Sequence, residues 1–378
     1  MKFIHLSDLH LGKRVNEFSM IEDQKDILAK ILTIIREEAP DAVLIAGDIY
    51  DKAVPSAEAV SLLDEFMVRL AQIDTQTFII SGNHDSAERL AFGGRLIAER
   101  GIHLSPVYNG HVEPITLSDE YGPVDIYMLP FVKPTHVRSF FPEETIESYT
   151  DAVRVAVEQM HVKADRRNVL ISHQFVTGAE RSESEISVGG TDNVDAAVFA
   201  PFDYVALGHI HGPQNVGSEH IRYCGTPLKY SFSEAKHHKS VSVIELGEKG
   251  SFSLRTVPLV PLHEMVELKG TYDELTRRSF YEHTSYASDY VHITLTDEED
   301  VPNAMAKLRT IYHNLMKLDY DNCRTRHHTE ITGTEDVEKK TPMELFRELF
   351  ELQNGCPMNE EQEAYMQKLI EEVWEAEV

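Results

Sequence analysis

Five short apolar segments of this sequence each end at residues of types that bind metal ions. The segments are residues 2–6, 42–46, 77–80, 169–171 and 204–207. The metal-binding residue types that follow them are, in chain order, Asp8, His10, Asp48, Asp51, Asn83, His84, Asp85, His173, His209 and His211. Carboxylates and imidazoles suit Mn²⁺, Fe²⁺ or Zn²⁺, and the lack of cysteine among them disfavours a thiolate zinc site. Two such ions roughly 3.5–4 Å apart activate water and mask phosphate charge, so the pattern indicates phosphoester hydrolysis.

Strands must position these residues. Short apolar segments that stop at glycine and polar residues are typical of buried strands. In open α/β sheets, ligands bind outside the carboxyl ends of the strands, so we expect the metal-binding side chains to share one rim. Asp48 is the natural candidate to bridge two ions, because Gly47 before it allows a tight turn and a close approach of the backbone.

Length and charge limit the possibilities. A chain of 378 residues exceeds the usual domain size, so we expect two or three domains. The net charge of −27 argues against a broadly basic DNA-binding surface. It does not exclude nucleic acid, because bound divalent ions add local positive charge. Three scattered cysteines favour reduced thiols and a cytoplasmic location, and no apolar run is long enough to span a membrane.

Residues 1–265 are predicted to form one domain in which strands alternate with helices. Helical spacing of apolar residues predicts helices at 21–38, 56–72, 87–100 and 151–161. The end of this region is predicted to be a β-meander of strands at 221–223, 240–246 and 251–257. Such a mixed pattern suits two packed sheets flanked by helices.

The remaining sequence changes character. Residues 266–335 are predicted to form a small α+β capping domain, with a strand at 290–295, a helix at 302–318 and a polar linker at 329–340. Residues 336–378 are predicted to form a helical tail whose first helix starts at a capping box, Thr341 to Glu344. Two short helices have little core of their own, which favours docking on a partner. The alternative is that they pack on their own domain.

The motif series resembles the calcineurin-like metallophosphoesterase superfamily. Longer motifs at 83–90, 186–191 and 227–234 resemble the SbcD family, the nuclease subunits of bacterial SbcCD complexes. The likeness in motifs covers the sequence up to about residue 260. Beyond it, only the order of the predicted elements is similar. The resemblance implies a four-layer α/β/β/α sandwich. The sequence departs from the family pattern at Gly212, Cys224 and Thr226, where substrate fit could change.

The resemblance also assigns roles to single residues. It gives one metal ion to Asp8, His10, Asp48 and His211. It gives the second ion to Asp48, Asn83, His173 and His209. His84 would contact the phosphate and protonate the leaving 3′ oxygen, and Asp85 would orient it. Arg14 and Arg89 would grip phosphates, or else belong to an ordinary solvated face. For Asp51 we favour a helix cap or a supporting hydrogen bond over a ligand role.

The function that the resemblance implies is a Mn²⁺-dependent DNA nuclease. It implies 3′→5′ exonuclease action on duplexes and endonuclease action on single strands and hairpins. It further implies control by the coiled-coil ATPase SbcC, a homodimer within a two-plus-two complex, and roles in DNA repair, recombination and replication.

Two other functions remain open from the sequence. One is a small-substrate phosphodiesterase or protein phosphatase on the same dimetal site. Against a protein phosphatase, Lys52 and Ala53 follow Asp51 where such enzymes usually carry Arg-Gly. A small-molecule enzyme would not need residues 266–378. The other alternative is a DNA-tethering scaffold with vestigial catalysis.

Overall fold

The computed structural model describes the chain except residues 183–184, 186–191, 323–324, 326–340 and 376–378. The motif at 186–191 and the predicted linker at 329–340 lie outside the described residues. The chain divides into two compact units, Met1–Glu264 and Met265–Val378, each with its own core. Among the described helices, none has the length and apolar character needed to cross a membrane.

The first unit contains two six-stranded sheets. The first sheet has the order β16-β15-β1-β4-β5-β6, from strands β1 Lys2–Leu6, β4 Ala42–Ala46, β5 Gln76–Ile80, β6 Ile102–Leu104, β15 Ser240–Leu246 and β16 Phe252–Pro258. The second has the order β13-β14-β12-β9-β8-β7, from strands β7 Ile115–Asp119, β8 Gly122–Leu129, β9 Arg167–His173, β12 Tyr204–Gly208, β13 Gln214–Val216 and β14 Ser218–Tyr223. The central strands β1, β4 and β5 pair in parallel, as do β8, β9, β12 and β14.

The two sheets pack face to face. One core cluster combines Phe3, Leu44 and Phe78 of the first sheet with Val169 and Tyr204 of the second. Every residue of β4 is buried, so this strand is covered on both faces, as is typical of parallel sheets with helices outside. The predicted four-layer α/β/β/α architecture is confirmed.

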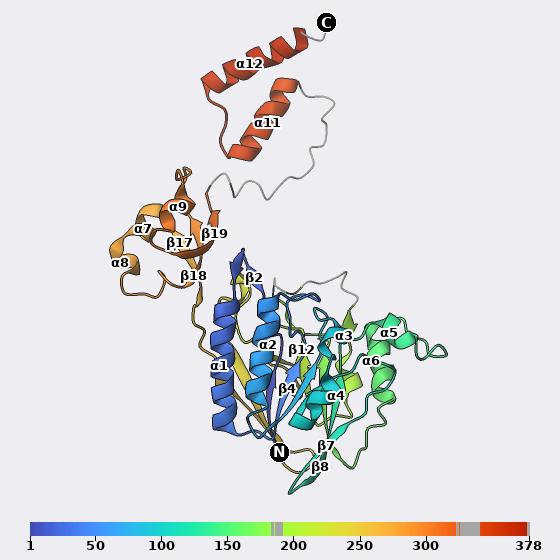
Figure 1. The fold of residues 1–378 in the computed structure, drawn as a ribbon. Helices are drawn as coiled ribbons and strands as arrows, with labels where there is room; N and C mark the ends of the chain where they lie inside the picture. Colours follow the sequence, from blue (N-terminus) through green and yellow to red (C-terminus); the bar gives the residue numbers. More distant parts are fainter. Residues whose placement is uncertain (183–184, 186–191, 323–324, 326–340, 376–378) are drawn as a thin grey trace. The chain divides into compact units, whose positions relative to one another are not determined.

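Helices supply the two outer layers. Helices α1 Ile21–Glu38 and α2 Ala57–Leu70 pack side by side (Figure 1). The residues that α1 buries recur at helical spacing, and Ser56 caps α2 by accepting a hydrogen bond from the backbone of Ala59. Outside the second sheet, α6 Tyr149–Glu158 contributes to the other large core cluster, near α5 Pro134–Arg138.

Two predictions for this unit are wrong in detail. The helix predicted at 87–100 is three pieces, α3 Ala87–Leu90, α4 Gly94–Ile97 and the 3₁₀ turn η1 Ala98–Arg100. Gly93, at φ 76°, breaks it. The predicted β-meander does not exist, because β14 pairs with β12 in the second sheet while β15 and β16 pair in the first.

The second unit begins with a parallel three-stranded sheet. Its strands are β17 Met265–Gly270, β18 Tyr290–Leu295 and β19 Asn314–Tyr320, in that order. The short helices are α7 Tyr272–Thr276, α8 Arg278–Tyr281 and α9 Ala304–Leu308. The helix predicted at 302–318 is therefore wrong beyond Leu308. Its later apolar residues, such as Leu315, extend the sheet and join its core, so tertiary pairing overrides helical spacing.

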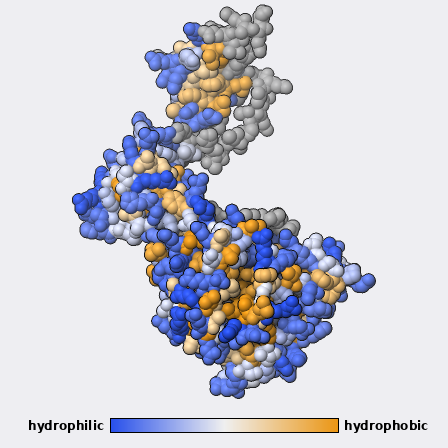
Figure 2. All heavy atoms as spheres, viewed as in Figure 1, coloured by the Kyte–Doolittle hydropathy of each residue, from blue (hydrophilic) through white to orange (hydrophobic). Residues whose placement is uncertain are grey.

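The tail forms two helices, α11 Pro342–Asn354 and α12 Glu360–Glu375. The predicted capping box is present: the backbone of Thr341 donates to the Glu344 carboxylate at 2.7 Å, and the Thr341 hydroxyl accepts from the Glu344 backbone at 3.3 Å. Arg347 pairs with Glu363 across the two helices at 2.7 Å. Hydrophobic residues gather at the surface of this pair (Figure 2). Leu349 and Tyr365 are 51% and 67% exposed.

Candidate metal centre

The loops at the carboxyl ends of the strands bring all seven candidate ligands together. The loop after β1 is tied to the loop after β4, since the backbone of Asp8 donates to Gly47 O at 3.0 Å and that of His10 to Asp48 O at 2.9 Å. The loop after β12 joins them, because the backbone of His209 donates to the Asp8 carboxylate at 3.0 Å. The backbone is constrained here: Asp8, His10, Asp48 and His209 all have positive φ, at 53°, 45°, 47° and 102°.

One group of ligand atoms combines Asp8, His10 and His211, all within 4.8 Å of one another. The Nε2 atoms of His10 and His211 are 3.2 Å apart, and Asp48 Oδ2 lies 3.7 Å from His10 Nε2. Two neutral imidazoles can make at most one hydrogen bond between these atoms, and His10 Nδ1 is buried without a hydrogen-bond partner among the described residues. A divalent cation shared by both rings would satisfy this arrangement.

A second group combines Asp8, Asp48 and His173. Asn83 Oδ1 lies 2.9 Å from both His173 Nε2 and His209 Nδ1, and Asp48 Oδ2 lies 3.4 Å from His173 Nε2. His173 Nδ1 is 2.8 Å from the carbonyl oxygen of Ala46 and donates to it, which turns Nε2 toward the other ligands. Asp48 therefore lies between the two groups, the place of a bridging carboxylate.

Burial and mutual attraction set the charges of these groups. Burial raises the pKa of Asp8 to about 6 and lowers that of His209 to about 3. Burial alone would raise the pKa of Asp48, but the nearby imidazoles of His173 and His10 hold it well below its ordinary value. Burial alone would lower the pKa of His173, but the Asp48 carboxylate raises it to about 9. Asp48 is thus ionised at neutral pH, as a bridging ligand requires, and the donor set fits two divalent ions.

Glycines allow the strands and loops to approach closely enough to form this centre. A Cβ added to Gly82 would lie 2.1 Å from Asp48 Oδ1, and one added to Gly208 would lie 1.8 Å from the carbonyl oxygen of Ala46. Real Cβ atoms do not approach other atoms this closely, so these positions require glycine.

We predict that Gly208→Ala destabilises the first unit by about 2 kcal/mol or more, because β4 and β12 would have to separate to admit the methyl group. Urea unfolding monitored by circular dichroism measures this. Gly247→Ala is the matched control, since its Cβ would meet nothing nearer than 3.5 Å. Equal unfolding midpoints for the two variants would show that the site tolerates a side chain at Gly208.

His84 forms a third group of ligand atoms with His10 and Asp48, at the edge of the other two. Its backbone donates to Asp48 Oδ1 at 2.9 Å, and its Nδ1 lies 2.9 Å from the carbonyl oxygen of Asp51. Its ring meets the ring of His10 edge to face, with centroids 4.9 Å apart. Because Nδ1 donates to a carbonyl, Nε2 is left for a substrate. The ring is partly exposed, as a group that contacts substrate must be.

The expectation that Asp85 orients His84 is not met. The Asp85 carboxylate instead accepts hydrogen bonds from the backbones of Ile49, Tyr50 and Gly82, at 3.0, 2.9 and 2.9 Å. These three donors belong to the loops after β4 and β5, so Asp85 holds those loops together. The physical reason is proximity: the turn points the carboxylate toward unsatisfied backbone N–H groups, which it must satisfy in a buried place. The backbone of Asp51 orients His84 instead.

The remaining predicted residues lie further out. The Asp51 carboxylate pairs with Lys13 at 2.8 Å and lies 3.8 Å from His10 Nδ1, which agrees with a supporting role. Arg14, on the two-residue strand β2 Arg14–Val15, is exposed and donates to the carbonyl oxygen of Glu17. Arg89 is exposed on α3. Within the described residues neither arginine hydrogen-bonds a candidate ligand, so their contact with phosphate stays a prediction.

Supporting residues were missed from the sequence. Gln24 donates to His10 O at 2.7 Å and accepts from the backbone of Gly12 at 2.9 Å, and Tyr230 donates to Leu9 O at 2.6 Å. Gln24 carried a usable signal, because it stands one turn before Ile27 and Leu28 on the buried face of α1, where an apolar residue is usual. Two further supporting residues, Glu234 and Lys239, contact His211.

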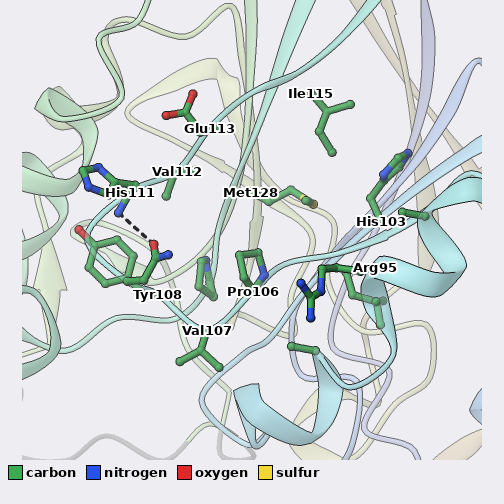
Figure 3. Close-up of a pocket in the computed structure, with 16 residues that line it drawn as sticks. Arg95, His103, Pro106, Val107, Tyr108, His111, Val112, Glu113, Ile115 and Met128 are labelled. Atoms are coloured by element: carbon green, nitrogen blue, oxygen red, sulfur yellow. Dashed lines mark hydrogen bonds between the residues drawn. The ribbon is translucent and has the colours of Figure 1, made fainter.

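A separate hollow of about 560 Å³ lies away from these ligands. It is lined from α4 by Arg95, from β6 by His103 and from the following segment by Tyr108 and His111 (Figure 3). None of the seven candidate ligands lines it. The metal-binding groups of the first unit therefore meet at the strand ends and not in this hollow.

The fold and the candidate dimetal site define a calcineurin-like phosphoesterase, and the family model of that description matches residues 1–213. A second model, described as the Type 5 capsule protein repressor C-terminal domain, matches residues 261–354. The chain belongs to the SbcD family, the nuclease subunits of SbcCD complexes. It is 34% identical over 344 residues to the SbcD protein of Staphylococcus epidermidis, covering 89% of this chain and 90% of the relative. The SbcD protein of Staphylococcus saprophyticus is 33% identical over 339 residues, covering 88% of each.

Solved structures are more distant. A dimetal phosphatase from Danio rerio is 13% identical, with a TM-score of 0.42, covering 69% of this chain and 96% of that chain. A protein from Thermus thermophilus is 12% identical, with a TM-score of 0.36, covering 68% of this chain and 98% of that chain. Scores this low carry no argument about function.

Proposed function

We propose that this chain is the nuclease subunit of an SbcCD-type complex, which hydrolyses DNA phosphodiesters with two divalent metal ions. The proposed activities are 3′→5′ exonuclease action on duplexes and endonuclease action on single strands and hairpins, in DNA repair, recombination and replication. The observation that carries the proposal is the position of Asp48 between two groups of ligand atoms. The extended similarity to the staphylococcal SbcD proteins supports it.

We assign the ligands as the family pattern does. One ion would be held by Asp8, His10, Asp48 and His211. The other would be held by Asp48, Asn83, His173 and His209. When bound, the ions supply charge against the phosphate and a nucleophilic water at neutral pH. Mn²⁺ is the proposed metal, since oxygen and imidazole donors suit it and no thiolate is among these ligands.

His84 supplies the proton in this proposal. Its Nδ1–H donates to Asp51 O at 2.9 Å, which fixes the ring and turns Nε2 away from that carbonyl. Nε2–H then faces the leaving 3′ oxygen and transfers a proton to it. Asp85 contributes only by holding together the loops that carry His84 and Asp48. Arg14 and Arg89 are exposed, and we assign them to contacts with phosphates along the DNA.

The proposed partner is the ATPase SbcC, in a two-plus-two complex with a dimer of this chain in the cytoplasm. In this arrangement residues 1–265 are the nuclease domain, 266–335 the capping domain and 336–378 the tail. Support for docking through the tail comes from its exposed apolar side chains, including Leu349, Tyr365 and Leu369. Each of these is costly to leave in water, and a coiled coil could cover them.

Removing residues 341–378 is predicted to abolish binding to SbcC and to leave basal nuclease activity within about twofold of the full chain, since no candidate ligand lies there. Co-elution on a sizing column measures binding. The triple variant Leu349→Ser, Tyr365→Ser, Leu369→Ser should reproduce the loss, and Glu351→Ala, on α11 with Leu349, should not. A complex that still forms without the tail would refute this surface.

The first test of the function is Mn²⁺-dependent cleavage of end-labelled duplex DNA beside a chromogenic phosphodiester, with and without EDTA. Metal-dependent shortening from the 3′ end supports the nuclease. Turnover of the small diester with intact DNA, even when SbcC and ATP are added, would favour a small-substrate phosphodiesterase. DNA binding without cleavage of either substrate would favour a scaffold.

A further inference from the structure

A buried network of polar residues stands behind His211. Glu234 and Thr226 are fully buried, and Lys239 is only 5% exposed. Glu234 Oε1 lies 3.1 Å from His211 Nδ1, and Glu234 Oε2 lies 2.6 Å from Lys239 Nζ. Lys239 Nζ also donates to Thr226 Oγ1 at 2.6 Å and to the carbonyl oxygen of His211 at 2.9 Å. The ammonium group thus uses its three protons on three acceptors within this network.

His211 is consequently held at three points. Its carbonyl accepts from Lys239, its backbone N–H donates to the Glu185 carboxylate, and its Nδ1–H donates to Glu234. Its Nε2 atom points the other way and lies 3.2 Å from His10 Nε2. The network therefore fixes both the place and the tautomer of one imidazole.

Stability alone does not account for this network. Burying a carboxylate and an ammonium costs solvation that their attraction often fails to repay, and apolar replacements of a buried pair are frequently as stable. The ion pair with Lys239 uses only one oxygen of the Glu234 carboxylate. Its stability therefore does not explain why the other oxygen faces the imidazole of His211. By contrast, His173 is oriented by a neutral carbonyl, Ala46 O. A charged acceptor on His211 makes that ring a stronger donor to a cation.

We propose that Glu234 is a positioning residue that sets the affinity of the first metal site, the one assigned to Asp8, His10, Asp48 and His211. Lys239 supplies its compensating charge. This inference rests on the proposed function. It adds that the two ions are held unequally, because the network contacts a ligand of one site and none of Asn83, His173 and His209 among the described residues.

The test is calorimetric titration of the full chain with Mn²⁺, together with electron paramagnetic resonance to distinguish coupled from single ions. The variant Glu234→Leu/Lys239→Met removes the network without leaving a buried charge. It should weaken one site by about 10–100-fold and replace the coupled signal by that of a single ion. The variant Glu234→Gln/Lys239→Met restores an acceptor for His211 Nδ1 and should recover most of the affinity.

The control is Glu158→Gln, which breaks an exposed 3.0 Å ion pair with Arg154 on α6 and should leave both sites unchanged. Two sites of wild-type affinity in the leucine variant would overturn the proposal. If that variant shows no cooperative melt, Glu234→Asp takes its place, because its shorter carboxylate keeps the charge near Lys239 but retracts from His211. Wild-type affinity there would likewise overturn it. If the wild-type chain itself takes up no Mn²⁺, the proposed function fails instead.

Discussion

Replacing Asp48 by asparagine is expected to reduce DNA cleavage by at least about a thousand-fold. Asp48 Oδ2 lies between the two groups of ligands, 3.7 Å from His10 Nε2 and 3.4 Å from His173 Nε2. Asparagine keeps the size of the side chain but removes the negative charge that offsets two divalent ions. Both metal sites should weaken together, so the loss appears in metal binding as well as in turnover.

The measurement is the rate of release of labelled nucleotides across a range of Mn²⁺ concentrations. Asp74→Asn, an identical chemical change at an exposed position, should behave as wild type. Full activity of Asp48→Asn at saturating Mn²⁺ would mean that Asp48 is not a bridging ligand.

Replacing His84 by glutamine is expected to slow DNA cleavage by about 10²–10⁴-fold while both metal ions remain bound. His84 lies beside the metal centre but its ring is fixed by Asp51 O, and glutamine cannot carry a transferable proton. The defect should depend on the leaving group. A diester that releases nitrophenolate needs no proton from the enzyme, so His84→Gln should cleave it at nearly the wild-type rate.

Calorimetry with Mn²⁺ supplies the companion measurement. Loss of an ion in His84→Gln would show that His84 is itself a metal ligand. This must be measured because the His84 ring contacts the ring of His10, a candidate ligand. An equal defect on DNA and on the nitrophenyl diester would contradict the role of proton donor.

The strands that carry the site could be predicted because their signals are local. The apolar segments at 2–6 and 42–46 coincide with β1 and β4, and the helix predicted at 21–38 coincides with α1. Burial on both faces of β4 requires an unbroken apolar run, which stands out in any sequence. The positions of the motif residues at the strand ends follow from the same rule.

Two of the errors arose where distant pairing decides the structure. Leu315 follows helical spacing, yet it lies in β19 beside β18. The sequence of β14 predicts the first strand of a meander, yet β14 pairs with β12 in the second sheet. Nothing within a few residues distinguishes these outcomes, because the partner strand supplies the deciding hydrogen bonds.

The contacts that the supporting residues make with the ligand loops also depend on distant parts of the chain. Gln24 and Tyr230 meet although 206 positions separate them, and Glu234 reaches His211 from a later loop. The sequence shows residue types and spacing, whereas these contacts depend on how three loops fold over one another. Asp85 illustrates the limit most directly: adjacency in sequence to His84 suggested a partner, but the turn directs its carboxylate to Ile49, Tyr50 and Gly82.

The left-handed backbone of Asp8, His10 and Asp48 has a consequence for the life of the protein in the cell. Each such residue costs about 1–2 kcal/mol, a sizeable share of the roughly 5–15 kcal/mol that keeps a domain folded. Glycine at these positions would relieve the strain but could not bind a cation. The strained backbone is therefore retained at the candidate ligands. Ions that bind only the folded chain return that free energy by mass action. We therefore expect metal supply to govern how long the newly made chain survives proteolysis, as well as how fast it works.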